Sequence, residues 1–197
     1  MRKRALTVLA CAAMAAPVGA LARPADEAAL PHIGPAPGFT LVSQSGRRVS
    51  LHDLRGRVTV VTFMFAGCSD TCPLLTSKLV GIQRRLGARV DDVRFAAITV
   101  DPLNDTPAVL QAYGRAHGID PARFTFLTGS MQEIDAVTRA YAVFRKPVPG
   151  GGAIDHTFLT SLVDRQGVLR VQYIGVRFDP QEFLRDITTL VNERGPP

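Results

Sequence analysis

Two cysteines four positions apart, Cys68 and Cys72, are the residues of this 197-residue chain best suited to redox or metal chemistry. In a helix, positions i and i+4 lie on one face, with Cα atoms about 6 Å apart. That separation permits either a disulfide or two thiolate ligands to one soft metal ion. A disulfide between such close positions closes a tiny loop and adds little stability. The spacing therefore favours a pair that opens and closes, or that holds a metal, over a purely structural bridge.

The histidines supply the next candidate ligand, because two thiolates alone are an incomplete site for most metals and imidazole suits copper and zinc. His32 lies in a proline-rich segment, His52 in a predicted surface turn, and His117 at a predicted helix end, where the helix dipole favours a cation. His156 follows three consecutive glycines and precedes a predicted strand. The spacing leaves two interpretations open, and in the first a flexible loop brings His156 over the cysteines as a ligand. The alternative is a hydrogen-bonded histidine at a strand edge.

Two acidic residues are candidates for supporting roles. Asp70 lies between the cysteines, where its carboxylate disfavours a neighbouring thiolate, so capping the next helix or binding a partner suits it better. Asp101 ends a predicted strand, at the sheet edge where ligand sites form in open α/β folds. Asp105 is expected to cap the helix that follows.

Strands and helices alternate along the chain and must position these residues. A Val- and Phe-rich run over 57–65 predicts a buried strand directly before the cysteines. Apolar spacing after them predicts a helix over 74–86. The other predicted elements are a hairpin of 39–42 and 48–50, strands 93–100 and 124–127, helices 106–117 and 130–144, a flexible loop over 146–154, a hairpin of 157–163 and 168–174, and a helix over 179–192.

This order predicts an α/β fold with a central mixed sheet flanked by helices. Two close cysteines at a strand-to-helix junction favour the thioredoxin-like fold. The hairpin over 39–50 would be an N-terminal β-hairpin extension of that fold.

The N-terminus predicts export from the cytoplasm. Arg2, Lys3 and Arg4 precede an apolar segment that ends in the small-residue site 20–22, as in a secretory signal peptide. The apolar run of about 18 residues is also at the lower limit for spanning a bilayer, so a membrane anchor is the alternative. We therefore assign 1–22 as signal peptide or anchor, the proline-containing 23–38 as an extended linker, and 39–197 as the folded domain.

Composition excludes several classes of protein. With 46% hydrophobic and 20% charged residues, the chain is globular and not intrinsically disordered. Residues 1–22 hold three of the 23 Lys and Arg residues and none of the 17 acidic ones, so the net charge of +6 falls to +3 without them. So mild a charge gives no indication of nucleic-acid binding.

Three motifs together resemble the SCO/SenC family of copper chaperones, which assist assembly of the copper A centre of cytochrome c oxidase. They are Phe65-x2-Cys68-x-Asp70-x-Cys72-Pro73, Val100-Asp101-Pro102-x2-Asp105-Thr106, and Asp155-His156-Thr157 before a strand. The similarity runs from about Phe39 to Val191. The three motifs occur in the family's order, behind an export signal.

The resemblance implies a thioredoxin-like domain that binds copper, as Cu(I) or Cu(II), through the thiolates of Cys68 and Cys72 and the imidazole of His156. Asp101 would be a nearby supporting residue, and Asp70 would shape the loop or the partner surface. The partners implied are the cytochrome c oxidase subunit that carries copper A or another copper acceptor, a copper donor chaperone, and a thiol-disulfide partner. The family's location implies the bacterial periplasm, with the domain soluble or tethered to the inner membrane.

Other functions stay open. A thiol-disulfide oxidoreductase would use the cysteines as its redox pair and keep the acceptor's cysteines reduced. A thioredoxin-superfamily peroxidase is disfavoured, because no peroxidatic Thr-x2-Cys sequence preceded by Pro occurs. A closed structural zinc site is disfavoured too, because two cysteines and one histidine leave a coordination position open.

Overall fold

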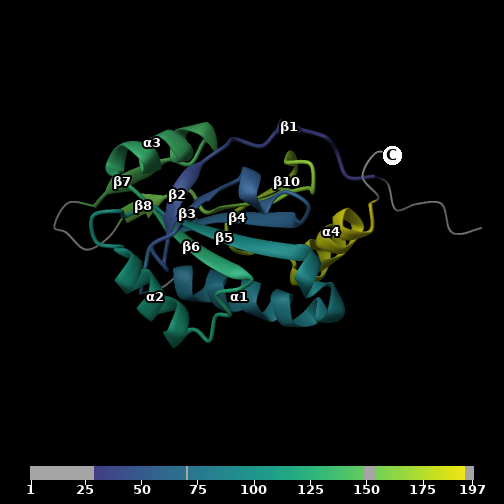
Figure 1. Cartoon of the computed structure of the whole chain (residues 1–197), viewed down its shortest axis with the longest axis horizontal. Helices are drawn as coiled ribbons and strands as arrows, with labels where there is room; N and C mark the ends of the chain where they lie inside the picture. The colour runs from purple at the N-terminus through teal and green to yellow at the C-terminus, as the bar shows by residue number, and fades with distance from the viewer. Residues whose placement is uncertain (1–28, 70, 149–153, 194–197) are drawn as a thin grey trace, which may run out of the picture.

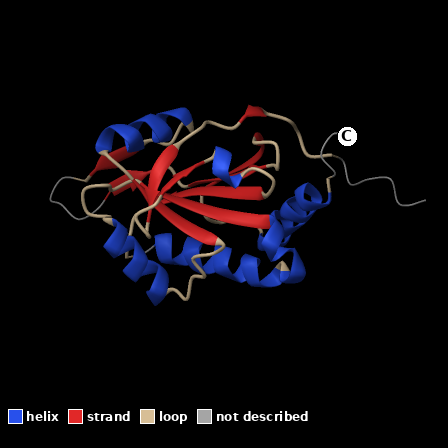
Figure 2. Ribbon diagram, in the orientation of Figure 1, coloured by secondary structure: helices blue, strands red, loops and turns tan. Residues whose placement is uncertain are grey.

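An eight-stranded mixed sheet runs through the centre of the protein in the computed structural model (Figures 1 and 2). The structure describes residues 29–69, 71–148 and 154–193, so the predicted signal or anchor lies outside it. The strand order is β1-β10-β9-β4-β5-β6-β2-β3. The strands are β1 (Gly34–Pro35), β2 (Thr40–Ser43), β3 (Arg48–Ser50), β4 (Val58–Met64), β5 (Val93–Thr99), β6 (Phe124–Thr128), β9 (Leu159–Val163) and β10 (Val168–Ile174).

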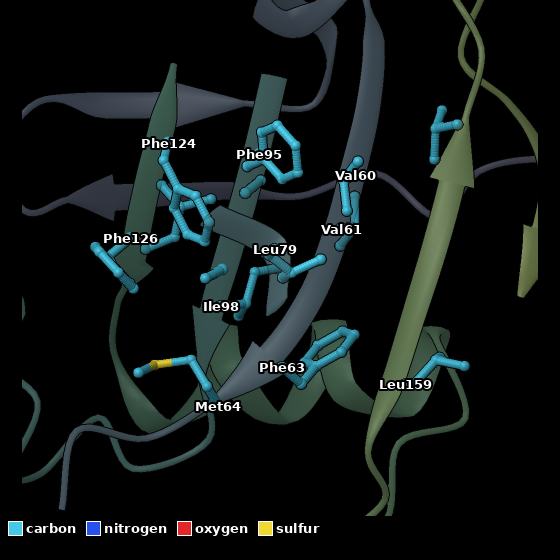
Figure 3. Packing of buried hydrophobic residues seen from close by; sticks show 14 of the residues in the cluster. Val60, Val61, Phe63, Met64, Leu79, Phe95, Ile98, Phe124, Phe126 and Leu159 are labelled. Atoms are coloured by element: carbon cyan, nitrogen blue, oxygen red, sulfur yellow. The ribbon is translucent and has the colours of Figure 1, made fainter. Parts of the chain in front are cut away.

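Strands β4, β5 and β6 are parallel and form the centre of the fold. Every residue of β4 is buried, which explains why its sequence has only two threonines among apolar residues and no charge, because a strand covered on both faces has no solvent-facing side. Side chains of these strands and of the first helix meet in one core, with Val61, Leu79 and Ile98 among them (Figure 3). This core fixes the carboxyl end of β4, where the first cysteine follows four residues later.

Four α-helices of the described residues flank the sheet: α1 (Thr71–Arg85), α2 (Pro107–Ala116), α3 (Met131–Ala140) and α4 (Pro180–Asn192). Helices α1 and α4 contact each other, and α3 lies across the sheet from α1 and α2 (Figure 1). The described residues also contain two 3-10 helices, η1 (His52–Leu54) and η2 (Gly87–Asp92). Among the helices of the described part of the chain, none has the length and apolar character needed to cross a membrane.

Local capping explains where the helices begin. A capping box of Ser130 and Glu133 starts α3, and it satisfies backbone N–H groups that have no partner within the helix. Asp179 accepts a hydrogen bond from the N–H of Gln181 and is followed by Pro180 at the start of α4. The sequence predicted both helix starts within one residue.

The predicted N-terminal hairpin is confirmed as strands β2 and β3, which pair antiparallel and join the sheet at β6. The described part of the predicted linker, residues 29–38, contributes one more element. Gly34 and Pro35 form β1, which pairs with the start of β10 at the other edge of the sheet. This segment is therefore attached to the folded domain.

Two predictions between α3 and β9 were wrong in part. The predicted helix over 130–144 ends at Ala140, since Ala142 has a positive φ of 56° and so leaves the helical conformation. Both ends of the predicted flexible loop 146–154 belong to a separate two-stranded sheet, in which β7 (Arg145–Pro147) pairs antiparallel with β8 (Ile154–His156). Residues 149–153 lie outside the described residues. His156 therefore ends a strand, and the next strand begins only at Leu159.

Candidate metal and redox site

The two cysteines lie where β4 passes into α1, as the sequence predicted. Cys68 is half-buried and precedes the helix, and Cys72 is fully buried in the first helical turn. No disulfide joins them, and the backbone N–H of Cys72 donates to Cys68 Sγ at 3.3 Å. The N–H of Cys68 in turn donates to the carbonyl of Phe65, at 3.3 Å. These bonds hold the two sulfur-bearing residues on one short turn.

Burial dominates the chemistry of Cys72. It raises the pKa of the Cys72 thiol to about 12, and a backbone hydrogen bond from Phe65 offsets only part of that shift. The thiol is therefore protonated at neutral pH. Metal binding to the Cys72 sulfur, or its oxidation to a disulfide, therefore requires the loss of this proton.

We expect iodoacetamide at pH 7 to modify Cys68 of the reduced native protein well before Cys72. Cys68 is partly accessible, whereas Cys72 is buried and protonated, and alkylation requires an accessible thiolate. Quenched time points analysed by peptide mass spectrometry give the two rates. In denaturant the two cysteines should react at similar rates. Similar rates in the native protein would contradict the burial described for Cys72.

His156 ends β8 with its imidazole buried and one nitrogen unused. Its Nδ1 lies 3.1 Å from the carbonyl oxygen of Thr157, and a carbonyl only accepts, so Nδ1 carries the proton. Burial lowers the pKa of His156 below its ordinary value, which keeps the ring neutral at pH 7. Nε2 therefore holds a lone pair, and within the described structure this buried atom has no hydrogen-bond partner. Such a nitrogen is suited to bind a metal ion.

Phe65 connects the cysteine turn to His156. Its backbone bonds to Cys68, and its ring contacts the His156 imidazole edge-on, with centroids 5.9 Å apart. The imidazole also contacts the ring of Phe158, with centroids 4.3 Å apart. The sequence motif included Phe65, but only the structure gives it this place between the two parts of the site.

The three candidate ligands are connected through Phe65 but do not form a closed metal site. Among the residues that the structure describes, no three His, Cys, Asp or Glu side chains come together closely enough to hold a metal ion. Asp101 accepts a hydrogen bond from Asn104 Nδ2 at 2.8 Å within its own turn. Asp70 lies outside the described residues. Binding one ion through all three ligands therefore requires a local rearrangement.

Asp105 has a different role from the predicted helix cap. The cap of α2 is Thr106, whose hydroxyl accepts from the N–H of Val109. Asp105 is 1% exposed and accepts hydrogen bonds from Ala66 N at 3.0 Å and from Thr99 Oγ1 at 2.5 Å. It thus ties the loop after β5 to Ala66, the second residue after β4. The sequence signal was Pro107, which suits the first helical position and so places the cap at 106.

Replacing Asp105 by Ala should lower the free energy of unfolding by about 2–3 kcal/mol, because two buried donors lose their acceptor. For a domain of this size we expect the thermal midpoint to fall by about 5–10 °C. The control is Asp101→Ala, which removes one half-exposed hydrogen bond and should cost less than about 1 kcal/mol. Calorimetry of both variants checks the difference, and equal midpoints would contradict the role given to Asp105.

Comparison with known proteins identifies the family of the chain. The family model described as SCO1/SenC matches residues 28–192. The SCO1 protein homolog of Bacillus subtilis is 33% identical over 147 residues, which cover 73% of this chain and 76% of that protein. The residues matched by the family model, 28–192, include the strands, the helices and the cysteine turn described above.

Solved structures agree in fold. ScoI of Bradyrhizobium japonicum with copper bound is 32% identical and superimposes with a TM-score of 0.71, over 79% of this chain and 98% of that chain. BsSco is a member of the Sco family of cytochrome c oxidase assembly proteins, and a disulfide switch was identified in it. It is 28% identical and superimposes with a TM-score of 0.71, over 83% of this chain and 97% of that chain. The likeness confirms the predicted thioredoxin-like α/β fold. The chain therefore belongs to the SCO1/SenC family.

Proposed function

We propose that the protein is a copper metallochaperone that helps to assemble the copper A site of cytochrome c oxidase. Copper is its cargo, and Cys68, Cys72 and His156 are the proposed ligands. The observation that carries this proposal is the buried lone pair of His156 Nε2, which faces no donor in the described structure. The copper-bound ScoI and the family's part in cytochrome c oxidase assembly support the choice of metal and acceptor.

The donor set suits copper. Two sulfurs and one imidazole are soft to intermediate ligands, which favour Cu(I) over hard cations. The half-buried Cys68 is the accessible member and would exchange ligands with a donor or an acceptor protein. The buried Cys72 releases its proton when the metal binds. Since the three ligands are not gathered in advance, binding and release would each involve a small local movement, which suits transfer better than permanent storage.

Thiol-disulfide exchange is the second candidate function, favoured by the adjacent reduced cysteines at the start of α1. In that reaction Cys68 attacks a partner disulfide as the thiolate and forms a mixed disulfide, releasing one partner thiolate. Cys72 then loses its proton and displaces the second partner thiolate. The partner gains two electrons and two protons, and the protein is left with a Cys68–Cys72 disulfide. This reaction could prepare the cysteines of a copper acceptor for metal.

The location and the supporting residues complete the proposal. The N-terminal segment 1–22 would export the domain to the periplasm and be either cleaved or kept as an anchor. Mass spectrometry of the exported protein distinguishes these two cases. Asp101 would support the site through its turn, which is joined to Asp105. Asp70 would face the partner or shape the cysteine turn.

An anaerobic competition titration of the reduced protein with a chromogenic Cu(I) chelator tests the copper proposal. One equivalent should bind tightly to the parent and be lost in the double variant Cys68→Ser, Cys72→Ser. If the parent binds no more tightly than this variant, the metallochaperone proposal fails. The reduction potential of the cysteine pair then becomes the property that tests the second candidate.

A further inference from the structure

The large hydrophobic side chains that the protein exposes gather at one end of the molecule. The described residues expose seven of them, and six surround the cysteine turn and His156. These six form what we name the apolar rim: Leu74, Leu103, Val109, Phe144, Val148 and Ile174. We infer that the apolar rim docks the protein that exchanges copper or electrons with Cys68, an inference that rests on the proposed function. The cysteine ligands of this partner would lie in an apolar, weakly charged surface.

The first part of the rim joins α1 to the end of β10. Leu74 is 63% exposed and comes two residues after the second cysteine. Lys78 lies one turn later on the same face of α1, and its Nζ donates to the carbonyl of Val176 at 2.5 Å. The loop that follows Ile174 is thereby held against α1. Ile174 itself is 80% exposed and pairs with Leu159, at the end of β9 that lies beside the carboxyl end of β4.

The second part lies beside His156. The N–H of Thr157 donates to the carbonyl of Phe144 at 2.9 Å, and the N–H of Phe144 donates to Thr157 Oγ1 at 3.3 Å. The ring of Phe144 is nevertheless 58% exposed. Val148 follows directly after β7, the strand that pairs with the strand ending in His156. The histidine is therefore bordered by apolar groups that no described segment covers.

The third part follows β5. The N–H of Val100 donates to the carbonyl of Met64 at 2.8 Å, so the ends of β5 and β4 lie together. Leu103, 75% exposed, is in the turn beyond this point, and Val109 lies in the first turn of α2. Figure 1 shows the starts of α1 and α2 and the strands β7 and β8 at the same end of the protein. The rim residues thus come from elements that begin or end beside the candidate site.

The chemistry of the site indicates what covers the rim. Copper passes by ligand exchange, and electrons pass through a mixed disulfide, so in both cases the partner's sulfur must touch Cys68. The partner's surface must then lie on the rim around it. Exposed apolar residues that gather in this way mark interaction sites. Charges of both signs lie beside the rim: Lys146 lies opposite Asp155 in the β7–β8 pairing, Asp101 precedes Leu103, and Arg177 follows Ile174. Apolar contact rather than charge is therefore expected to carry the binding.

The test uses copper transfer to a defined probe, the apo soluble domain of the cytochrome c oxidase subunit that carries copper A. The double variant Leu103→Ser, Ile174→Ser is compared with the parent and with Ile33→Ser. Ile33 is the seventh exposed side chain, 55% exposed, and precedes β1, which pairs with the start of β10, at the end of that strand opposite Ile174. We expect the second-order transfer rate constant to fall by about tenfold or more in the double variant. Ile33→Ser should match the parent, and all three proteins should bind Cu(I) equally tightly.

Salt dependence separates apolar from charged docking. The parent's transfer rate constant should change little between about 0.05 and 0.5 M salt, because screening weakens charge-driven association and not apolar contact. A steep fall with salt would overturn the inference. A concentration-dependent dimer of the parent that the double variant abolishes would assign the rim to self-association instead, and would also overturn it.

The rim inference and the proposed function fail in distinguishable ways. If the parent transfers copper and the double variant does so equally fast, the rim inference is wrong and the copper function stands. If the parent neither binds nor transfers copper, the copper function is wrong. The same three proteins are then compared in reducing the disulfide of the oxidised probe. Equal rates in that reaction would overturn the rim inference as well.

Discussion

Replacing His156 by Ala is expected to lower Cu(I) affinity by at least about hundredfold, because even the loss of an outer-shell partner weakens metal binding by 10- to 100-fold. The imidazole is the proposed third ligand, and its Nε2 lone pair is buried without a partner among the described residues. Disulfide exchange should continue at nearly the parent rate, since the thiol chemistry involves only the two cysteines. Chelator competition and a reductase assay measure the two properties separately.

The controls for this variant use the other histidines and the fold. His52→Ala removes an exposed histidine in η1 and should leave copper affinity unchanged. Because His156 is buried, a thermal melt must show that the Ala variant remains folded, and His156→Gln retains more of the side-chain volume. Unchanged copper affinity in both folded His156 variants would remove His156 from the ligand set. Equal loss of copper binding and of disulfide exchange would point to a structural role.

Replacing Arg170 by Ala should lower the free energy of unfolding by about 3–5 kcal/mol, which is the usual effect of removing one partner of a buried ion pair. Arg170 is 1% exposed and bonds to Asp164 Oδ2 at 3.1 Å and Glu193 Oε2 at 2.5 Å. It also donates to the carbonyls of Leu30 at 2.6 Å and Pro31 at 2.8 Å. In the variant, the carboxylates of Asp164 and Glu193 and the two backbone carbonyls lose the guanidinium that donates to them. The carboxyl group of Asp164 is then buried without its ion-pair partner.

A matched surface arginine makes this prediction specific. Arg123 pairs with Asp91 and Asp120 at the surface, where solvent weakens ion pairs, so Arg123→Ala should leave the chemical-unfolding midpoint close to that of the parent. In the Arg170 variant, residues 29–35 should also become more sensitive to protease than in the parent, since two of their carbonyls lose their donor. Equal unfolding midpoints for the two variants would show that the Arg170 cluster adds little stability.

The sequence determined the order of the main elements, because their signals are local, whereas the short strands β1, β7 and β8 were not predicted. The apolar run over 57–65 and the helical spacing after it predicted β4 and α1 closely, and Pro180 marked the start of α4. The cysteine pair at the strand-to-helix junction, together with the motifs at Asp101 and His156, led to the correct family. Hydrophobic periodicity, capping and motif spacing each act over a few residues, so one chain without relatives is enough to reveal them.

Tertiary structure decided the contacts between distant residues. Arg170 is the extra residue where the β9–β10 register shifts, so it follows the buried Leu169 and is itself buried. Its partner Leu30 lies 140 residues away. Asp105 turns inward to Ala66, and the His156 ring meets Phe65. Each of these positions depends on which strands become neighbours, and a helix cap and an inward-facing carboxylate look alike in sequence. The chain alone therefore indicated the chemistry. Packing across the sheet decided which buried polar groups find partners, and among residues 29–69, 71–148 and 154–193 it gives His156 Nε2 none.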